Sequence, residues 1–135
     1  MDNRELIRLA LEAREMAYVP YSKYKVGAAL LARGGKVYQG CNIENAAYTP
    51  TNCAERTAFF KAVSEGEREF EAIAIVGGYD GAISDYAYPC GVCRQVMMEF
   101  CNPAKFRVIT AVSEEKYLEK TLEEMLPHGF GPANL

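Results

Sequence analysis

Apolar residues recur along the chain in two different periods, and these predict helices and strands in turn. A helix is predicted from Asp2 or Asn3, either of which can cap it, to about Tyr18, before Pro20. Apolar residues at helical spacing form its buried face: Leu6, Ala10, Ala13 and Ala17.

Four segments have the alternating or continuous apolar pattern of β-strands. The first two, 24–33 and 36–43, flank Gly34-Gly35 and predict an antiparallel hairpin with a two-residue turn. The segment 71–78 is almost continuously apolar, which is typical of a strand covered on both faces. The fourth strand is predicted at 106–112.

Two further helices follow the second and third strands. One is predicted over 53–64, although Thr51 and Asn52 are better capping residues than the thiol of Cys53. The other is predicted over 90–101. Both helices begin after a loop that leaves a strand.

A short helix is predicted last. It begins at a capping box formed by Thr121 and Glu124 and ends at Pro127. A tail containing Gly and Pro, residues 128–135, follows it. No linker, repeat or low-complexity segment divides the chain. We therefore predict a single α/β domain over 1–135, in which helices cover a sheet.

Composition and charge narrow the class of partner. Hydrophobic residues make up 50% of the chain and charged residues 24%, which is typical of a globular domain and argues against disorder. The net charge is -3, and the basic residues are interleaved with acidic ones. A protein that holds nucleic acid usually carries a basic stripe. We expect a small neutral ligand and no nucleic acid.

The chain also lacks the sequence features of a membrane or secreted protein. No apolar run approaches the roughly 20 residues that span a bilayer. Residues 1–15 carry charges throughout, where a signal peptide has an uninterrupted apolar segment. We expect no membrane partner and a cytoplasmic location, where thiols stay reduced.

Three of the five cysteines are spaced to bind a metal. Cys90 and Cys93 lie three apart at a predicted helix start, and Cys53 begins another helix. Helix N-termini favour thiolate over thiol. Three protein ligands leave the fourth tetrahedral position open, as in catalytic zinc sites, and the only histidine, His128, lies far away in the tail. We expect one Zn²⁺ per chain.

Two residues beside Cys53 have candidate roles in the chemistry. In zinc deaminases a glutamate follows the first ligand by two residues, and a PCxxC segment supplies the other ligands. Cys53-Ala54-Glu55 and Pro89–Cys93 match that pattern in order. A zinc ion with three thiolates has a net charge of -1, which the Arg56 guanidinium would offset. A solvated helix-surface position is an equally good interpretation of Arg56.

With these motifs the chain resembles, almost from end to end, the small cytidine deaminases of the three-cysteine type. The stretches that carry the resemblance are PYSKYKVGAALL, GCNIENAAY, TNCAERTA, PCGVCRQV and LPHGF. The resemblance implies a three-layer α/β/α domain with a central mixed five-stranded sheet. It also implies a homotetramer with active sites at the subunit interfaces.

The resemblance further implies a reaction and the residues that perform it. The reaction is the zinc-dependent hydrolysis of cytidine and 2'-deoxycytidine to uridine and 2'-deoxyuridine with release of ammonia, a step of pyrimidine salvage. The zinc ligands would be Cys53, Cys90 and Cys93. Glu55 would carry a proton from water to N3 of cytosine and a second one to the leaving amino group.

Substrate contacts follow from the same resemblance. Asn42 and Glu44 would hold the ribose hydroxyls, and their alternate spacing on a strand end places both on one face. Tyr24 would stack on the base, at a position where the family usually has phenylalanine. Ala54 would contact the substrate, and Phe130 would complete the pocket of a neighbouring subunit.

Other functions explain fewer of these features. A thiol–disulfide oxidoreductase would use the PCGVC segment but leaves Cys53, Glu55 and the CNIEN segment unexplained. A structural zinc module needs a fourth ligand that the sequence does not supply. A polynucleotide deaminase conflicts with the acidic charge balance, and a free-base deaminase conflicts with Asn42 and Glu44.

Overall fold

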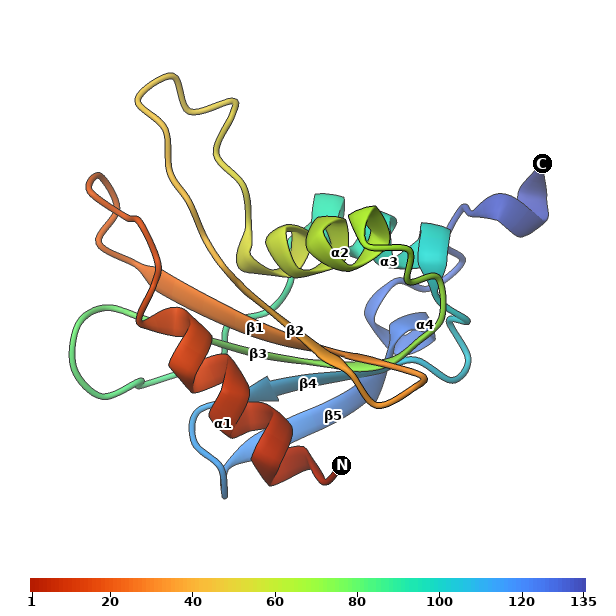
Figure 1. The fold of residues 1–135 in the computed structure, drawn as a ribbon, viewed down its shortest axis with the longest axis horizontal. Coiled ribbons are helices and arrows are strands. Elements are labelled where there is room, and N and C mark those ends of the chain that lie inside the picture. The colour runs from red at the N-terminus through yellow and green to blue at the C-terminus, as the bar shows by residue number, and fades with distance from the viewer.

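The computed structural model describes residues Met1 to Leu135 and contains one five-stranded sheet with helices on both faces (Figure 1). The strand order is β2-β1-β3-β4-β5, in which β3 and β4 are parallel and the other neighbours antiparallel. The strands are β1 (Lys25–Ala32), β2 (Val37–Cys41), β3 (Phe70–Gly78), β4 (Arg107–Ala111) and β5 (Tyr117–Thr121). The helices are α1 (Asn3–Arg14), α2 (Ala54–Ser64), α3 (Gly91–Phe100), α4 (Leu122–Met125) and a 3₁₀ turn, Pro132–Asn134.

The helices form separate layers on the two faces of the sheet (Figure 1). In β1, Ala28 and Leu30 point into the core under α2, α3 and α4, whereas Ala29 and Leu31 point into the core under α1. In β3 the buried run predicted at 71–78 likewise divides between both cores. The three-layer α/β/α arrangement is confirmed. None of the helices combines the length and apolar character needed to cross a membrane.

Sheet topology brings the N-termini of α2 and α3 together. Strands β2 and β3 are both antiparallel to β1, so they run in the same direction and their C-terminal ends lie at the same end of the sheet. The chain continues from β2 to α2 and from β3 to α3, and both helices begin near that end of the sheet. Gly40 lets α2 approach, because a Cβ there would lie 2.4 Å from the carbonyl oxygen of Ala54 and 2.6 Å from the amide of Ala58.

Two boundaries near the N-terminus differ from the prediction. Helix α1 ends at Arg14, four residues before Tyr18, and Tyr18 instead forms an isolated β-bridge with Ile43. The Tyr18 amide donates to Asn42 O (3.0 Å), and the Tyr18 carbonyl accepts from the amide of Glu44 (2.9 Å). The hairpin turn has three residues, Arg33 to Gly35, because Ala32 N bonds to Lys36 O and Gly35 adopts a φ of 100°.

Strand β5 was missing from the strands predicted from the apolar pattern, although the family resemblance implied a five-stranded sheet. It is the edge strand beside β4, and its sequence YLEKT includes two adjacent exposed charged residues, Glu119 and Lys120. Charged residues protect an edge strand from pairing with other chains, but they also remove the apolar alternation. The capping box of Thr121 and Glu124 is confirmed at the start of α4.

Candidate active site

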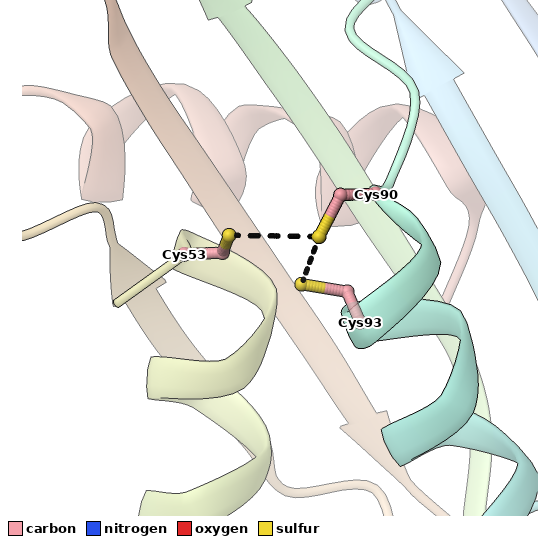
Figure 2. Close-up of side chains that lie close together, drawn as sticks. All are labelled: Cys53, Cys90 and Cys93. Atoms are coloured by element: carbon pink, nitrogen blue, oxygen red, sulfur yellow. Dashed lines mark hydrogen bonds between the residues drawn. The ribbon is translucent and has the colours of Figure 1, made fainter. Parts of the chain in front are cut away.

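Three cysteine sulfurs meet between the starts of α2 and α3 (Figure 2). Cys53 and Cys90 are the N-cap residues of the two helices, and Cys93 lies in the first turn of α3. Sγ of Cys90 is 3.9 Å from that of Cys53 and 3.6 Å from that of Cys93. The predicted ligand set is therefore brought together, from segments 37 residues apart.

The spacing of the sulfurs fits a tetrahedral zinc ion. With a Zn–S distance of about 2.3 Å, the edge of such a tetrahedron is about 3.8 Å. All three sulfurs lie within 4.8 Å of one another. Cys93 is buried and Cys90 is exposed, so the group is open on one side. Three thiolates with one open side suit a catalytic zinc site better than a structural one.

Electrostatics around Cys53 favour the thiolate that a metal requires. The neighbouring Cys93 thiol lowers the pKa of Cys53 to about 5, and Arg56 adds to this effect against the opposing effect of burial. Nη2 of Arg56 donates to Sγ of Cys53 over 3.1 Å. Arg56 is thus in contact with the sulfur cluster, as the functional interpretation of this residue requires.

Glu55 is buried beside the sulfurs, with 5% of its surface exposed. Burial raises the pKa of this carboxyl to about 7, and the negative charge of Cys53 adds to the shift. A group with a pKa near neutrality can both accept and donate a proton at neutral pH. The start of α2 thus places a thiol of the cluster and a carboxyl whose pKa suits proton transfer side by side.

The site opens into a cavity of about 430 Å³. Six of the predicted site residues share one space, because the lining includes Tyr24, Asn42, Cys53, Ala54, Glu55 and Cys90. Most of the lining residues are apolar, and the polar ones are Asn42, Thr51, Asn52 and Glu55. A mostly apolar cavity with a few polar groups suits a small molecule.

Comparisons with known proteins agree with this geometry. Residues 1–110 match the family model for the cytidine and deoxycytidylate deaminase zinc-binding region. The chain belongs to this family. It is 53% identical to the cytidine deaminase of Sporosarcina psychrophila over 135 residues, which are 100% of this chain and 96% of the relative. It is 52% identical to the cytidine deaminase of Halalkalibacterium halodurans over 130 residues, covering 96% and 95% of the two chains.

Solved structures of the deaminase family share the fold. The crystal structure of cytidine deaminase from Burkholderia pseudomallei superposes with a TM-score of 0.85 at 47% identity, over 96% of this chain and 100% of that one. The cytidine deaminase of Mycobacterium tuberculosis gives a TM-score of 0.82 at 37% identity, over 97% and 98%. Family membership and fold are thereby shown, and the three-cysteine cluster fits the zinc-binding region that defines the family.

The two residues expected to hold the ribose have different surroundings in this deaminase. The Asn42 side chain donates to Tyr24 O and accepts from Val26 N, both over 2.9 Å, which leaves one N–H and one lone pair unused. Glu44 lines a neighbouring cavity of about 440 Å³. Its Oε1 accepts from the amides of Tyr21 (3.0 Å) and Ser22 (3.1 Å). Hydrogen bonds from Ser22 and these amides hold the pKa of Glu44 below its usual range.

Phe130 lies outside the cavity of its own chain. It is 59% exposed, and its carbonyl accepts a hydrogen bond from Nε2 of Gln95 over 2.8 Å. The tail that carries it extends away from the sheet (Figure 1). Its exposure leaves the aromatic ring free to contact another molecule.

The motifs did not reveal part of the cavity wall. Tyr86, Ala87 and Tyr88 line the cavity from the loop between β3 and α3. The only sequence signal was the presence of two tyrosines just before the PCGVC segment. Their role depends on the path of the loop back over the sheet, which no local pattern specifies.

Proposed function

We propose that this chain catalyses the hydrolytic, zinc-dependent deamination of cytidine and 2'-deoxycytidine. The products are uridine or 2'-deoxyuridine and ammonia, with water as the second reactant. The observation that carries the proposal is the buried Glu55 carboxyl beside three convergent thiols, with Glu55, Cys53 and Cys90 lining one cavity. The relatives that are about half identical over the full chain are cytidine deaminases, which supports the substrate class.

The ligands of the metal would be Cys53, Cys90 and Cys93. Bound there, zinc would lower the pKa of a coordinated water from 15.7 toward about 7. Arg56, in contact with Cys53 Sγ, offsets part of the negative charge of three thiolates. Convergence of the two helix N-termini stabilises the same charge through their partial positive ends.

Glu55 moves the protons. Its carboxylate accepts a proton from the attacking water and transfers it to N3 of cytosine, which makes C4 electrophilic. The water oxygen then bonds to C4. Glu55 then takes the remaining proton from that oxygen and delivers it to the amino group, so that the C4–N4 bond breaks, C4=O forms and ammonia leaves. Its burial keeps bulk water from competing for these protons.

Substrate orientation follows from the cavity lining. The base would lie between the Tyr24 ring and the Ala54 end of α2, with its C4 edge toward the sulfurs. The unused amide N–H and lone pair of Asn42 would meet the ribose. Glu44 would reach the sugar from the adjoining cavity, which shares Thr51 with the first.

The decisive experiment follows ammonia release and the ultraviolet change of cytosine to uracil, with cytidine added to metal-analysed protein. The expected result is turnover with one zinc per chain, abolished by a chelator and restored by zinc. Zinc without turnover would contradict the proposed reaction. Zinc-free protein whose Cys90 and Cys93 cycle to a disulfide would point to an oxidoreductase. Because the proposed ligands must stay reduced, we also propose a cytoplasmic location.

We further propose a homotetramer in which Phe130 contributes to a neighbouring subunit's cavity. An exposed aromatic ring beside two glycines that pack on Met98 suits docking onto a second copy of the chain. Phe130→Ala is expected to raise KM for cytidine about tenfold, as for loss of an aromatic contact at an interface. Leu135→Ala, at a tail residue that is 98% exposed, is the matched control. Unchanged KM and oligomer mass in Phe130→Ala would contradict the proposal.

A further inference from the structure

Arg14, the last residue of α1, is buried without an acidic partner. Only 6% of its surface is exposed, and it takes part in no ion pair of the chain. Its guanidinium instead donates to three backbone carbonyls: those of Lys25 (3.3 Å), Gly78 (2.9 Å) and Tyr79 (2.6 Å). Burying a cation without an anion costs free energy, so hydrophobic packing alone does not account for this residue.

Through its hydrogen bonds to these carbonyls, Arg14 connects the start of β1 to the end of β3, beside the cavity. Lys25 and Gly78 form the terminal pair in the register of β1 with β3, so Arg14 lies across the end of that ladder. Tyr79 begins the loop that leads to Cys90. On the outer side, Nζ of Lys25 and Oδ1 of Asp80 form an ion pair of 2.9 Å between the same two segments.

Tyr24 depends on both segments for its place in the cavity wall. It directly precedes Lys25, and its ring packs edge-on against the ring of Tyr79, with centroids 5.2 Å apart and planes at 79°. The Tyr24 ring packs directly on Gly77, where a side chain would not fit. A Cβ at Gly77 would lie 3.2 Å from Oη and Cε1 of Tyr24 and 2.8 Å from Cβ of Ala87. The position of the Tyr24 ring therefore depends on the spacing of the two strand ends that Arg14 connects.

We propose that Arg14 is a positioning residue for nucleoside binding. Its guanidinium fixes the start of β1 against the end of β3, and thereby holds the Tyr24 ring where it contacts the substrate base. This inference rests on the proposed function. Since the sulfurs and Glu55 lie on α2 and α3, on the opposite face of the sheet from α1, loss of Arg14 should affect substrate binding and leave the chemical step intact.

The test compares Arg14→Met and Arg14→Lys with wild type and with Arg8→Met. Arg8 is the matched control, because it lies on the same helix, is exposed, and forms only a 3.9 Å ion pair with Glu5. Arg14→Met is expected to raise KM for cytidine about tenfold, with kcat within about twofold and zinc content unchanged. Lysine keeps the charge but has a shorter reach and no planar fork, so Arg14→Lys should lie between wild type and Arg14→Met.

A double-mutant cycle with Tyr24→Leu separates positioning from a general structural role. If Arg14 acts through Tyr24, Arg14→Lys should raise KM much less in the Tyr24→Leu background than in wild type. Equal increases in both backgrounds, an unchanged KM, or a fall in kcat at constant KM would each overturn the proposal. Because the cycle uses Arg14→Lys, it remains informative if Arg14→Met does not fold.

A readout without substrate keeps this inference distinct from the proposed function. In protein with ¹³C-labelled tyrosine, the Tyr24 ring signal, identified by its loss in Tyr24→Leu, should shift in Arg14→Lys and stay unchanged in Arg8→Met. An unmoved Tyr24 signal in Arg14→Lys would overturn the positioning role. Lack of cytidine turnover by wild-type protein would overturn the proposed function and leave this measurement valid.

Discussion

The four α-helices begin in two different ways. Helices α1 and α4 are capped by Asp2 and Thr121, whose side chains accept from backbone amides of their first turns. Helices α2 and α3 begin at Cys53 and Cys90, and neither thiol makes a capping hydrogen bond. The first pair serves stability, while the second pair leaves helix N–H groups free beside the sulfur cluster.

Two residues that are better N-caps than cysteine lie next to the start of α2, but their side chains make other hydrogen bonds. Thr51 and Asn52 directly precede Cys53, but neither caps α2 as the sequence allowed. The Thr51 hydroxyl accepts from Asn45 N (3.1 Å), and Nδ2 of the Asn52 side chain donates to Thr57 Oγ1 (3.3 Å). A helix start that departs from the best local choice, with good capping residues adjacent, is expected at a functional site.

The largest expected effect comes from comparing the glutamates in the first turns of α2 and α4. Glu55→Gln removes the proton carrier and keeps the sulfurs, so kcat should fall about 10³-fold or more while zinc content stays the same. Glu124→Gln should leave turnover unchanged, because glutamine also completes a capping box. The assay is ammonia release from cytidine, with zinc determined on the same samples.

Near-wild-type turnover in Glu55→Gln would contradict its role as the proton carrier. Loss of zinc together with turnover would instead assign Glu55 a part in metal binding. A comparable fall in Glu124→Gln would mean that any change in a first turn disturbs the enzyme, and the distinction between the two pairs of helices would disappear.

Cys53→Ser replaces one sulfur atom with oxygen, which should improve the cap of α2 and weaken metal binding. Serine is a good N-cap, so the chelator-treated variant should be about 1 kcal/mol more stable than chelator-treated wild type in urea denaturation. The zinc-supplied variant should hold much less metal and lose turnover, because a hydroxyl is a poorer ligand than a thiolate. Retained zinc and turnover would show that Cys53 is dispensable to the site.

Local patterns predicted most elements and the central chemistry of the site. The alternation in β1, the continuous apolar run of β3 and the spacing of Cys90 and Cys93 each depend on neighbouring residues alone. Strand β5 escaped the pattern because its charged residues face solvent at a sheet edge, and only tertiary pairing with β4 makes it a strand.

Features that depend on the path of the chain were beyond the sequence. Arg14 follows an ordinary helical pattern, and nothing near it indicates that its guanidinium reaches Gly78 and Tyr79, more than 60 residues away. Tyr86 and Tyr88 line the cavity because of the path of the loop between β3 and α3, which no local pattern specifies. The resemblance supplied Tyr24 and Asn42, whose meeting at the strand ends local patterns do not specify.

The smallest expected effect comes from removing the Asp2 cap of α1, one of the two helices whose caps serve stability alone. Oδ1 of Asp2 accepts from Glu5 N over 2.9 Å, and Asp2→Ala removes this cap from α1. The expected cost is about 1 kcal/mol, a fall in Tm of about 3 °C for a domain of this size, measured at one protein concentration because association shifts Tm. Turnover should not change, because Asp2 lies at the opposite end of α1 from Arg14. Asp2→Ser should restore most of the stability, and a KM change in Asp2→Ala would mean that α1 as a whole, rather than Arg14, controls the cavity.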